Sequence, residues 1–245
     1  MKPSKSIMHK SYFIAKCMTT AIFLIFLLGG CALWDRLFSE QEKSPAELMT
    51  EAMEDFDGGD LKSSTETFQK IKDRYPYSKH AVEAELRMAD SLYKRKLYDE
   101  AFDAYTEFER LHPTNKDIPY VIYQKGMCDF SQASTIDRDQ SHILKAKQEF
   151  DRLIKRFPRT TYAGLARRKL RDCYVSLSEY ELYVGHYYYK MKKYRTAMMR
   201  YKYLIKNYPD LGQYHEALEY LGKCEQKLAE KKKKARWWLP DIFSD

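Results

Sequence analysis

Histidine and the other usual carriers of catalytic chemistry are scattered along this chain without a catalytic spacing. No histidine belongs to an HExxH phrase or has a cysteine or carboxylate at metal-ligand spacing. GxSxG, P-loop and GxGxxG phrases are also absent from the sequence. The sequence therefore predicts a protein that is not an enzyme and needs no metal or cofactor. The six histidines are His9, His80, His112, His142, His186 and His215.

The strongest chemical signal lies at Cys31. Residues 1–16 are basic with no acidic residue, residues 17–28 form a short apolar run, and a Leu-Gly-Gly tripeptide leads directly to the cysteine. The run is too short to span a bilayer comfortably. A thiolate can take a diacylglyceryl group as a thioether. The pattern resembles a bacterial lipoprotein signal and predicts Cys31 as an acylated mature N-terminus. An ordinary signal peptide and an uncleaved anchor remain the alternatives.

This signal sets the expected organisation of the chain. Residues 1–30 are the predicted signal peptide, 31–43 a lipid-anchor tether, 44–230 the folded body and 231–245 a basic, aromatic tail. Ala32, rather than Asp, follows the cysteine, which by resemblance favours sorting to the outer membrane. Several acyl chains, such as palmitate, would hold the protein there firmly.

Three further cysteines, Cys128, Cys173 and Cys224, lie far apart in the body. They form no CxxC pair and are expected to pack as small apolar side chains. A disulfide between two of them remains open.

A short phrase that occurs four times defines the elements of the body. A small residue is followed by an aromatic residue at four, an apolar residue at seven and a proline at twelve positions further on. The spacing places the first three on one helical face, and the proline ends the helix. The phrase resembles the second helix of a tetratricopeptide (TPR) repeat. Its copies are Ser64/Phe68/Ile71/Pro76, Ala101/Tyr105/Phe108/Pro113, Ala146/Phe150/Leu153/Pro158 and Ala197/Tyr201/Leu204/Pro209.

These phrases predict an all-α, TPR-like α-solenoid of about five helix-turn-helix repeats. Ser44-Pro45 marks the first helix start and Asp60 caps the second helix. Gly126 is expected to allow close helix packing, and 131–141 to be a polar loop. The expected later helices cover 79–94, 98–112, from 117 onward, 142–157, 161–190 without a break, and 213–234.

Charge argues against a nucleic-acid partner. The formal charge is +8, but the basic surplus lies at the two ends, and the remaining body carries 34 basic and 33 acidic residues. A nucleic-acid binder normally has a basic face on its fold. The tail, KKKKARWW from Lys231, is either a solvated helix end or a contact with anionic lipid or a partner.

Three segments resemble the BamD family, the lipoprotein component of the outer-membrane β-barrel assembly machinery. They are residues 112–127 (HPTNKDIPYVIYQKGM), residues 138–158 with Arg138-Asp139 and His142, and residues 180–210 with Tyr180-Glu181-Leu182-Tyr183-Val184. The resemblance covers roughly residues 44–230. It implies a periplasm-facing scaffold held at the outer membrane by its N-terminal lipid. It also implies contacts with the BamA POTRA region, with other Bam lipoproteins and with unfolded outer-membrane proteins.

The resemblance also places candidate binding residues. An extended stretch around Ile118, Tyr120 and Tyr123, with Tyr93 nearby, would line a groove for the C-terminal signals of clients. For Tyr120 and Tyr123, filling the space between repeats is the alternative. Arg200 matches the arginine that faces BamA in the family, and an intramolecular ion pair is its alternative.

Two other functions stay open at this point. A TPR lipoprotein that pilots secretins or coordinates cell-wall synthesis would share the same fold. A lipid-anchored enzyme inside a TPR-like shell would need convergent titratable groups in a pocket.

Overall fold

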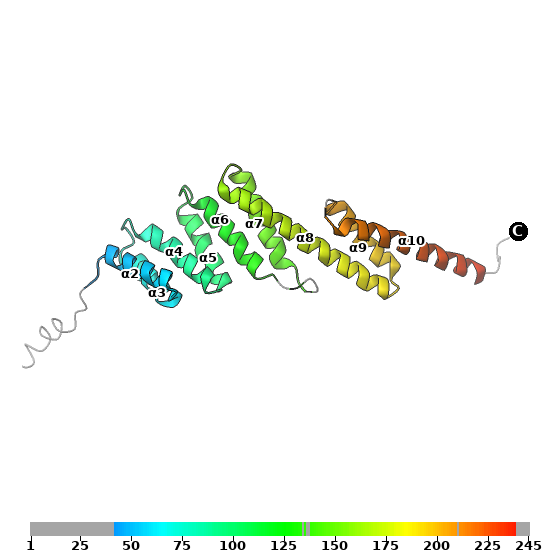
Figure 1. Cartoon of the computed structure of the whole chain (residues 1–245), viewed down its shortest axis with the longest axis horizontal. Coiled ribbons are helices and arrows are strands. Elements are labelled where there is room, and N and C mark those ends of the chain that lie inside the picture. Colours follow the sequence, from blue (N-terminus) through cyan, green and yellow to red (C-terminus); the bar gives the residue numbers. More distant parts are fainter. Residues whose placement is uncertain (1–41, 134, 136–137, 210, 239–245) are drawn as a thin grey trace, which may run out of the picture. The chain divides into compact units, whose positions relative to one another are not determined.

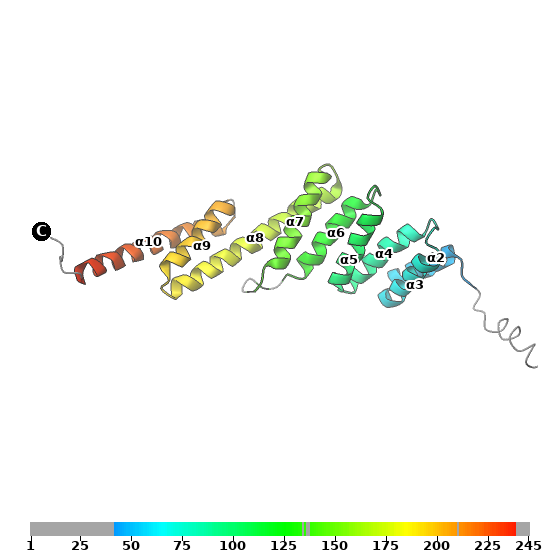
Figure 2. The ribbon, with the colours of Figure 1, turned by 180° about the vertical axis from the view of Figure 1, so that it is seen from behind.

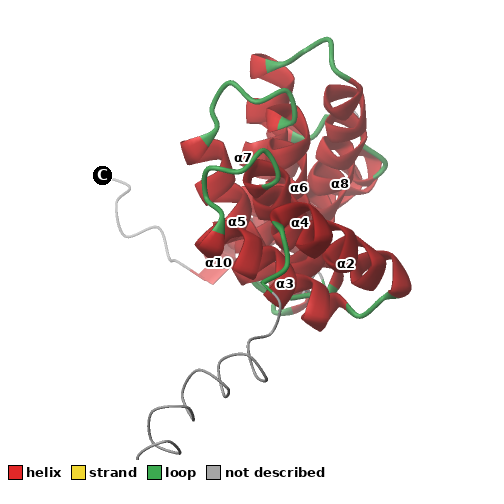
Figure 3. Cartoon of the chain, turned by 90° about the vertical axis from the view of Figure 1, so that its left-hand side faces the viewer, coloured by secondary structure: helices red, strands yellow, loops and turns green. Residues whose placement is uncertain are grey.

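The computed structural model describes residues 42–133, 135, 138–209 and 211–238, and this part of the chain contains nine α-helices and no strand (Figure 1; Figure 3). The predicted all-α class is confirmed. Cys31 and the expected signal peptide lie outside the described residues. The helices are α2 (Pro45–Gly58), α3 (Leu61–Arg74), α4 (Ala81–Lys94), α5 (Tyr98–Leu111), α6 (Ile118–Ser131), α7 (Ser141–Arg156), α8 (Thr161–Lys190), α9 (Tyr194–Asn207) and α10 (Gln213–Trp238).

The repeated phrase forms α3, α5, α7 and α9, as the sequence predicted. All twelve of its small, aromatic and apolar side chains are buried, and each of these helices ends at a tyrosine, phenylalanine or histidine directly before the phrase proline. The four C-cap residues donate their backbone N–H to the carbonyl four residues earlier, at 2.8–2.9 Å. Because proline cannot continue this ladder, the four helices stop at the same place in the phrase.

Side-chain caps start several helices. Ser44 and Glu47 form a capping box, in which the Ser44 N–H donates to Glu47 Oε2 at 2.8 Å and the Glu47 N–H donates to Ser44 Oγ at 3.3 Å. Asp60 Oδ1 accepts from the Ser63 N–H at 3.1 Å, and Thr160 Oγ1 accepts from the Ala163 N–H at 3.2 Å. The predicted caps at Ser44 and Asp60 are therefore confirmed.

From α3 onward each helix packs against the next one in the chain (Figure 1; Figure 2). α2 joins the stack through the buried cluster of Leu48, Met49, Ala52 and Phe56 with Phe68 and Ile71. The pairs α4/α5, α6/α7 and α8/α9 are TPR-like, and α2 and α3 form a similar pair through the shared cluster. α10 packs on α9 as the first helix of a further repeat. The 30-residue α8 contacts α7 as well as α9, so it replaces the turn that would separate two repeats.

Glycine residues let α6 and α8 approach a buried aromatic ring of the following helix. A Cβ added at Gly126 on α6 would lie 2.5 Å from the Phe150 ring of α7, and one at Gly185 on α8 would overlap the Tyr201 ring of α9. A side chain at either place would push the helix pair apart. The expected close packing at Gly126 is confirmed.

Three expectations change in the structure. The stretch from Ile118 to Tyr123 is the first part of α6, as the helix expected from 117 onward predicted, so the description of this stretch as extended is wrong. Pro119 sits in the first turn, where it needs no N–H partner. The tail predicted from Lys231 begins inside α10, which continues to Trp238. Cys128, Cys173 and Cys224 are all buried free thiols, so the open disulfide does not form.

In the described ranges, no helix combines the length and apolar character that crossing a membrane requires.

We expect Gly126→Ala to lower the free energy of unfolding by about 1–3 kcal/mol, because the new methyl group meets the Phe150 ring. Gly164→Ala on α8 is the matched control, since nothing lies within 4 Å of its added Cβ. The control should be neutral or stabilising by up to about 1 kcal/mol. Urea denaturation of the two variants measures both values. Equal stability of the two would contradict the packing described here.

Candidate functional site

Three tyrosines of α6 and α8 lie close together, and a fourth, on α4, is bonded through its hydroxyl to Ser131 at the end of α6. Tyr93 comes from α4, Tyr120 and Tyr123 from α6, and Tyr162 from α8; these four residues are called the tyrosine surface below. The Tyr162 ring lies 5.3 Å from the Tyr120 ring and 6.0 Å from the Tyr123 ring, centroid to centroid. The structure therefore brings Tyr120 and Tyr123 together as the sequence predicted, and adds Tyr162, which sequence analysis missed.

A buried carboxylate fixes the inner edge of this surface. Asp90 on α4 is 5% exposed, and its Oδ1 accepts hydrogen bonds of 2.6 Å from the hydroxyls of both Tyr105 and Tyr120. Its Oδ2 accepts from Arg87 Nη1 at 3.0 Å. Burial, followed by the nearby Asp90 charge, raises the pKa of both tyrosines above their ordinary value. The Tyr120 hydroxyl is therefore a donor inside the fold. This agrees with the alternative given for Tyr120, in which the residue fills the space between repeats.

Tyr123 and Tyr162 differ from Tyr120 in having uncommitted hydroxyls. Among the residues that the structure describes, neither hydroxyl has a hydrogen-bond partner, while Tyr93 shares a 3.0 Å bond with Ser131 Oγ. The Tyr123 ring is half-buried and packs 5.9 Å from the Phe150 ring. Burial also raises the pKa of Tyr123 above its ordinary value, so its hydroxyl stays a neutral donor near neutral pH.

Ile118 does not belong to an accessible groove. Its side chain is 1% exposed and sits inside the main core cluster. It occupies the first turn of α6 with its apolar face toward the neighbouring helices, so a ligand cannot reach it without unfolding that turn. The groove position predicted for Ile118 is therefore wrong, because helix formation turns this residue inward.

Arg200 on α9 reaches back to α8. Its Nη1 lies 3.2 Å from Glu181 Oε2, and the side chain of Arg200 is 41% exposed while that of Glu181 is 11% exposed. The intramolecular ion pair left open by the sequence is present. The guanidinium nevertheless keeps part of its surface in solvent, where a second carboxylate can bind to it.

A charged network inside the stack was not predicted. The Lys125 side chain is 7% exposed, and its Nζ lies 3.3 Å from Glu109 Oε2 and 3.8 Å from Glu149 Oε1. Arg152 pairs with both of these carboxylates, which joins α5, α6 and α7 through ion pairs. No motif marks Lys125 in the sequence, because its partners are 16 and 24 positions away.

Three of the histidines have carboxylate partners within the fold. His112 Nε2 lies 2.8 Å from Glu85 Oε2, and His142 Nδ1 lies 3.1 Å from Asp129 Oδ1. His186 Nε2 lies 3.1 Å from Glu216 Oε1. In the described ranges, no group of three or more histidine, cysteine, aspartate or glutamate side chains could hold a metal ion.

Stacked helix pairs with a repeated small-aromatic-proline phrase define the class of TPR-like α-solenoid proteins. Within that class, the YfiO family of outer membrane lipoproteins matches residues 41–237, and the chain belongs to this family. It shares 31% identity with the outer membrane protein assembly factor BamD of Rickettsia prowazekii, over 84% of this chain and 81% of that protein.

More distant relatives carry the same description. The BamD proteins of Neisseria gonorrhoeae and Vibrio cholerae are 28% and 25% identical, covering 77% and 85% of this chain and 74% and 90% of their own lengths. A solved TPR protein from Thermus thermophilus overlies 73% of this chain and 99% of its own at 16% identity, with a TM-score of 0.42, too low to bear on function.

We expect Asp90→Asn to lower the free energy of unfolding by about 2–4 kcal/mol, because it removes the charge that two tyrosines and an arginine share. Asp103→Asn on α5 is the control, since this residue is exposed and should change stability by less than about 0.5 kcal/mol. Chemical denaturation followed by circular dichroism gives both values. An Asp90→Asn protein as stable as the control would remove the carboxylate from its supporting role.

Proposed function

We propose that this protein is a periplasm-facing scaffold of the β-barrel assembly machinery, anchored to the outer membrane by lipid on Cys31. It binds C-terminal signals of unfolded outer-membrane proteins on the tyrosine surface and the BamA POTRA region through Arg200. Membership of the YfiO family supports the outer-membrane role. The single observation that carries the client site is the pair of uncommitted hydroxyls at Tyr123 and Tyr162.

The tyrosine surface suits an extended peptide with an aromatic end. Such a peptide brings backbone carbonyls that need donors, and a terminal ring that gains from contact with other rings. Tyr123 and Tyr162 supply hydroxyl donors and aromatic rings, with ring centroids 6.0 Å apart, while a hydrogen bond to Asp90 fixes Tyr120 next to Tyr162. A surface that is ordered before binding loses little conformational entropy on contact. Tyr93 on α4, whose hydroxyl is bonded to Ser131 at the end of α6, is proposed to extend this surface.

The mechanism is binding and positioning, with no bond made or broken. A lipoprotein that pilots secretins or coordinates cell-wall synthesis shares the TPR-like scaffold, but the curated relatives named above are outer membrane protein assembly factors. Other Bam lipoproteins are further proposed partners, on the same family resemblance.

Lipid attachment is tested at Cys31. In the Cys31→Ser protein we expect an unprocessed precursor that incorporates no labelled fatty acid, because a hydroxyl does not replace the thiolate as acceptor. Cys173→Ser, which changes a buried thiol in α8, should still be labelled. Metabolic labelling followed by gel analysis makes the comparison. Labelling of the Cys31→Ser protein at the level of the parent would refute this anchor.

Client binding is tested with photo-crosslinkers placed singly along the chain. A crosslinker at Tyr123 or Tyr162 should capture a peptide that ends in phenylalanine, and one at Tyr93 should do so less often. Tyr203 on α9, which is 48% exposed, is the control tyrosine outside the surface. The Tyr120 position should capture little, because its side chain points to Asp90. Capture at Tyr203 with none at Tyr123 and Tyr162 would place the client elsewhere.

The partner contact is tested by comparing both members of the Arg200–Glu181 pair. Arg200→Gln should weaken binding of the BamA POTRA region by about 1–2 kcal/mol, less than a fully buried pair would lose, because the guanidinium is partly exposed. Glu181→Gln frees the same guanidinium and should preserve binding. Lys202→Gln, an exposed change on the same helix, is the charge control.

Arg200→Glu is a poorer test of this contact than Arg200→Gln. It would set two carboxylates against each other where Glu181 is nearly buried, so we expect it to lower the melting temperature. Titration calorimetry with the glutamine variants measures binding without this loss of stability. Unchanged affinity of a folded Arg200→Gln protein would exclude Arg200 from the interface.

A further inference from the structure

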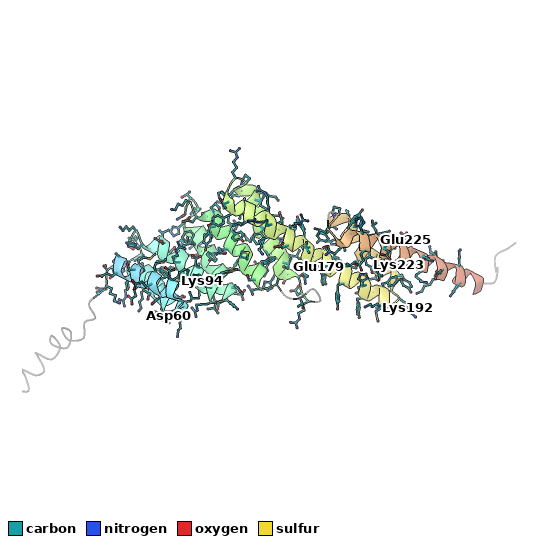
Figure 4. The ribbon with its side chains drawn as sticks, in the orientation of Figure 1. Asp60, Lys94, Glu179, Lys192, Lys223 and Glu225 are labelled. Carbon is teal, nitrogen blue, oxygen red and sulfur yellow. The ribbon has the colours of Figure 1, made fainter. Side chains whose placement is uncertain are left out.

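An open hollow of about 780 Å³ lies where the α8–α9 turn and the start of α9 face the later part of α10. Five cationic residues line it, and no carboxylate does among the residues that the structure describes. Lys192 marks the turn and Lys223 the earlier part of α10 in Figure 4. The five cations are Lys192, Lys193, Arg195, Lys231 and Lys232.

These cations are unbalanced within the fold. None of the five forms an ion pair with a carboxylate in the described part of the chain, whereas Lys223 and Lys227 of α10 pair with Glu219 and Glu230. Lys231 is held in place by its own contacts: Nζ lies 5.0 Å from the Tyr194 ring centroid and 3.5 Å from the Lys192 carbonyl oxygen. Like charges gathered in one hollow repel one another, and an anion relieves that repulsion.

The remaining wall of the hollow is largely apolar. Tyr194, Met198, Met199 and Leu228 contribute to it, and Met199 is 69% exposed. An anion that fits therefore carries an apolar part next to its charge. Four of the five cations are lysines, whose ammonium groups are point charges without the fork that matches a single carboxylate. This composition favours the surface of an anionic bilayer over an acidic peptide segment.

We propose that this hollow binds anionic phospholipid, with headgroup phosphates among the lysines and the upper acyl region against Met198 and Met199. The site rests on the membrane attachment proposed above, which keeps it close to lipid. Lysine character continues along α10 with the exposed Lys233 and Lys234, and the sequence then runs Ala-Arg-Trp-Trp. Each lysine near an anionic surface adds to the attraction, which salt screens.

The test uses the full-length protein in vesicles that contain a photoactivatable phospholipid. The vesicles are phosphatidylcholine alone or phosphatidylcholine mixed with phosphatidylglycerol, and cross-linked peptides are mapped by mass spectrometry. We expect adducts on segments 192–199 and 228–232 to be about tenfold more abundant with phosphatidylglycerol, and to decrease as salt is raised. Equal labelling in both kinds of vesicle would overturn the proposal.

Paired charge reversals sharpen the test. Lys231→Glu with Lys232→Glu should reduce these adducts at least about tenfold. Lys62→Glu with Lys70→Glu changes two exposed lysines of α3 by the same charge and should reduce them little. An equal loss in both double variants would mean a nonspecific charge effect and refute the site.

Two further outcomes separate this proposal from the proposed function. If the protein binds vesicles but its hollow gains no adduct, the lipid site is wrong and the membrane anchor stands. If it binds no vesicle, both are wrong. In native membranes, a photo-crosslinker at Met199 that captures an acidic protein and no lipid would also overturn the lipid assignment.

Discussion

The contact between a buried aromatic ring and a glycine of the neighbouring helix sets the spacing on which the rest of the structure depends. Phe150 lies on Gly126, and Tyr201 lies on Gly185, in each case where a Cβ would not fit. These contacts bring α6 against α7 and the second half of α8 against α9. They thereby place the tyrosines of α6 beside Tyr162, and Arg200 beside α8.

Buried polar groups connect neighbouring repeats through hydrogen bonds and ion pairs. Asp90 on α4 takes hydrogen bonds from α5 and α6, and Lys125 on α6 joins carboxylates of α5 and α7. Removing one member would leave buried charge without a partner, which costs more than an average hydrogen bond. The bond to Asp90 fixes the Tyr120 hydroxyl, whereas the hydroxyls of Tyr123 and Tyr162 have no partner among the described residues. The proposed client surface is therefore ordered by the fold before any ligand is bound.

The sequence predicted local structure well and long-range partners poorly. Helical periodicity, caps and prolines act within a few residues, so the ends of α3, α5, α7 and α9 and the unbroken α8 could be predicted. The partners of Asp90, Lys125 and Arg200 come from other helices and have no spacing rule. Ile118 was misplaced for a related reason: a helix was expected from residue 117, but which face of it meets the core depends on the neighbouring helices, and Ile118 lies on that buried face.

The composition of the complex around the native protein tests the account most directly. The protein would be extracted from outer membranes in mild detergent, purified by an affinity tag, and its partners identified by mass spectrometry. The account predicts BamA together with unfolded outer-membrane proteins, and loss of BamA but not of those clients in the Arg200→Gln protein. Recovery of a secretin or a cell-wall synthase without BamA would contradict it.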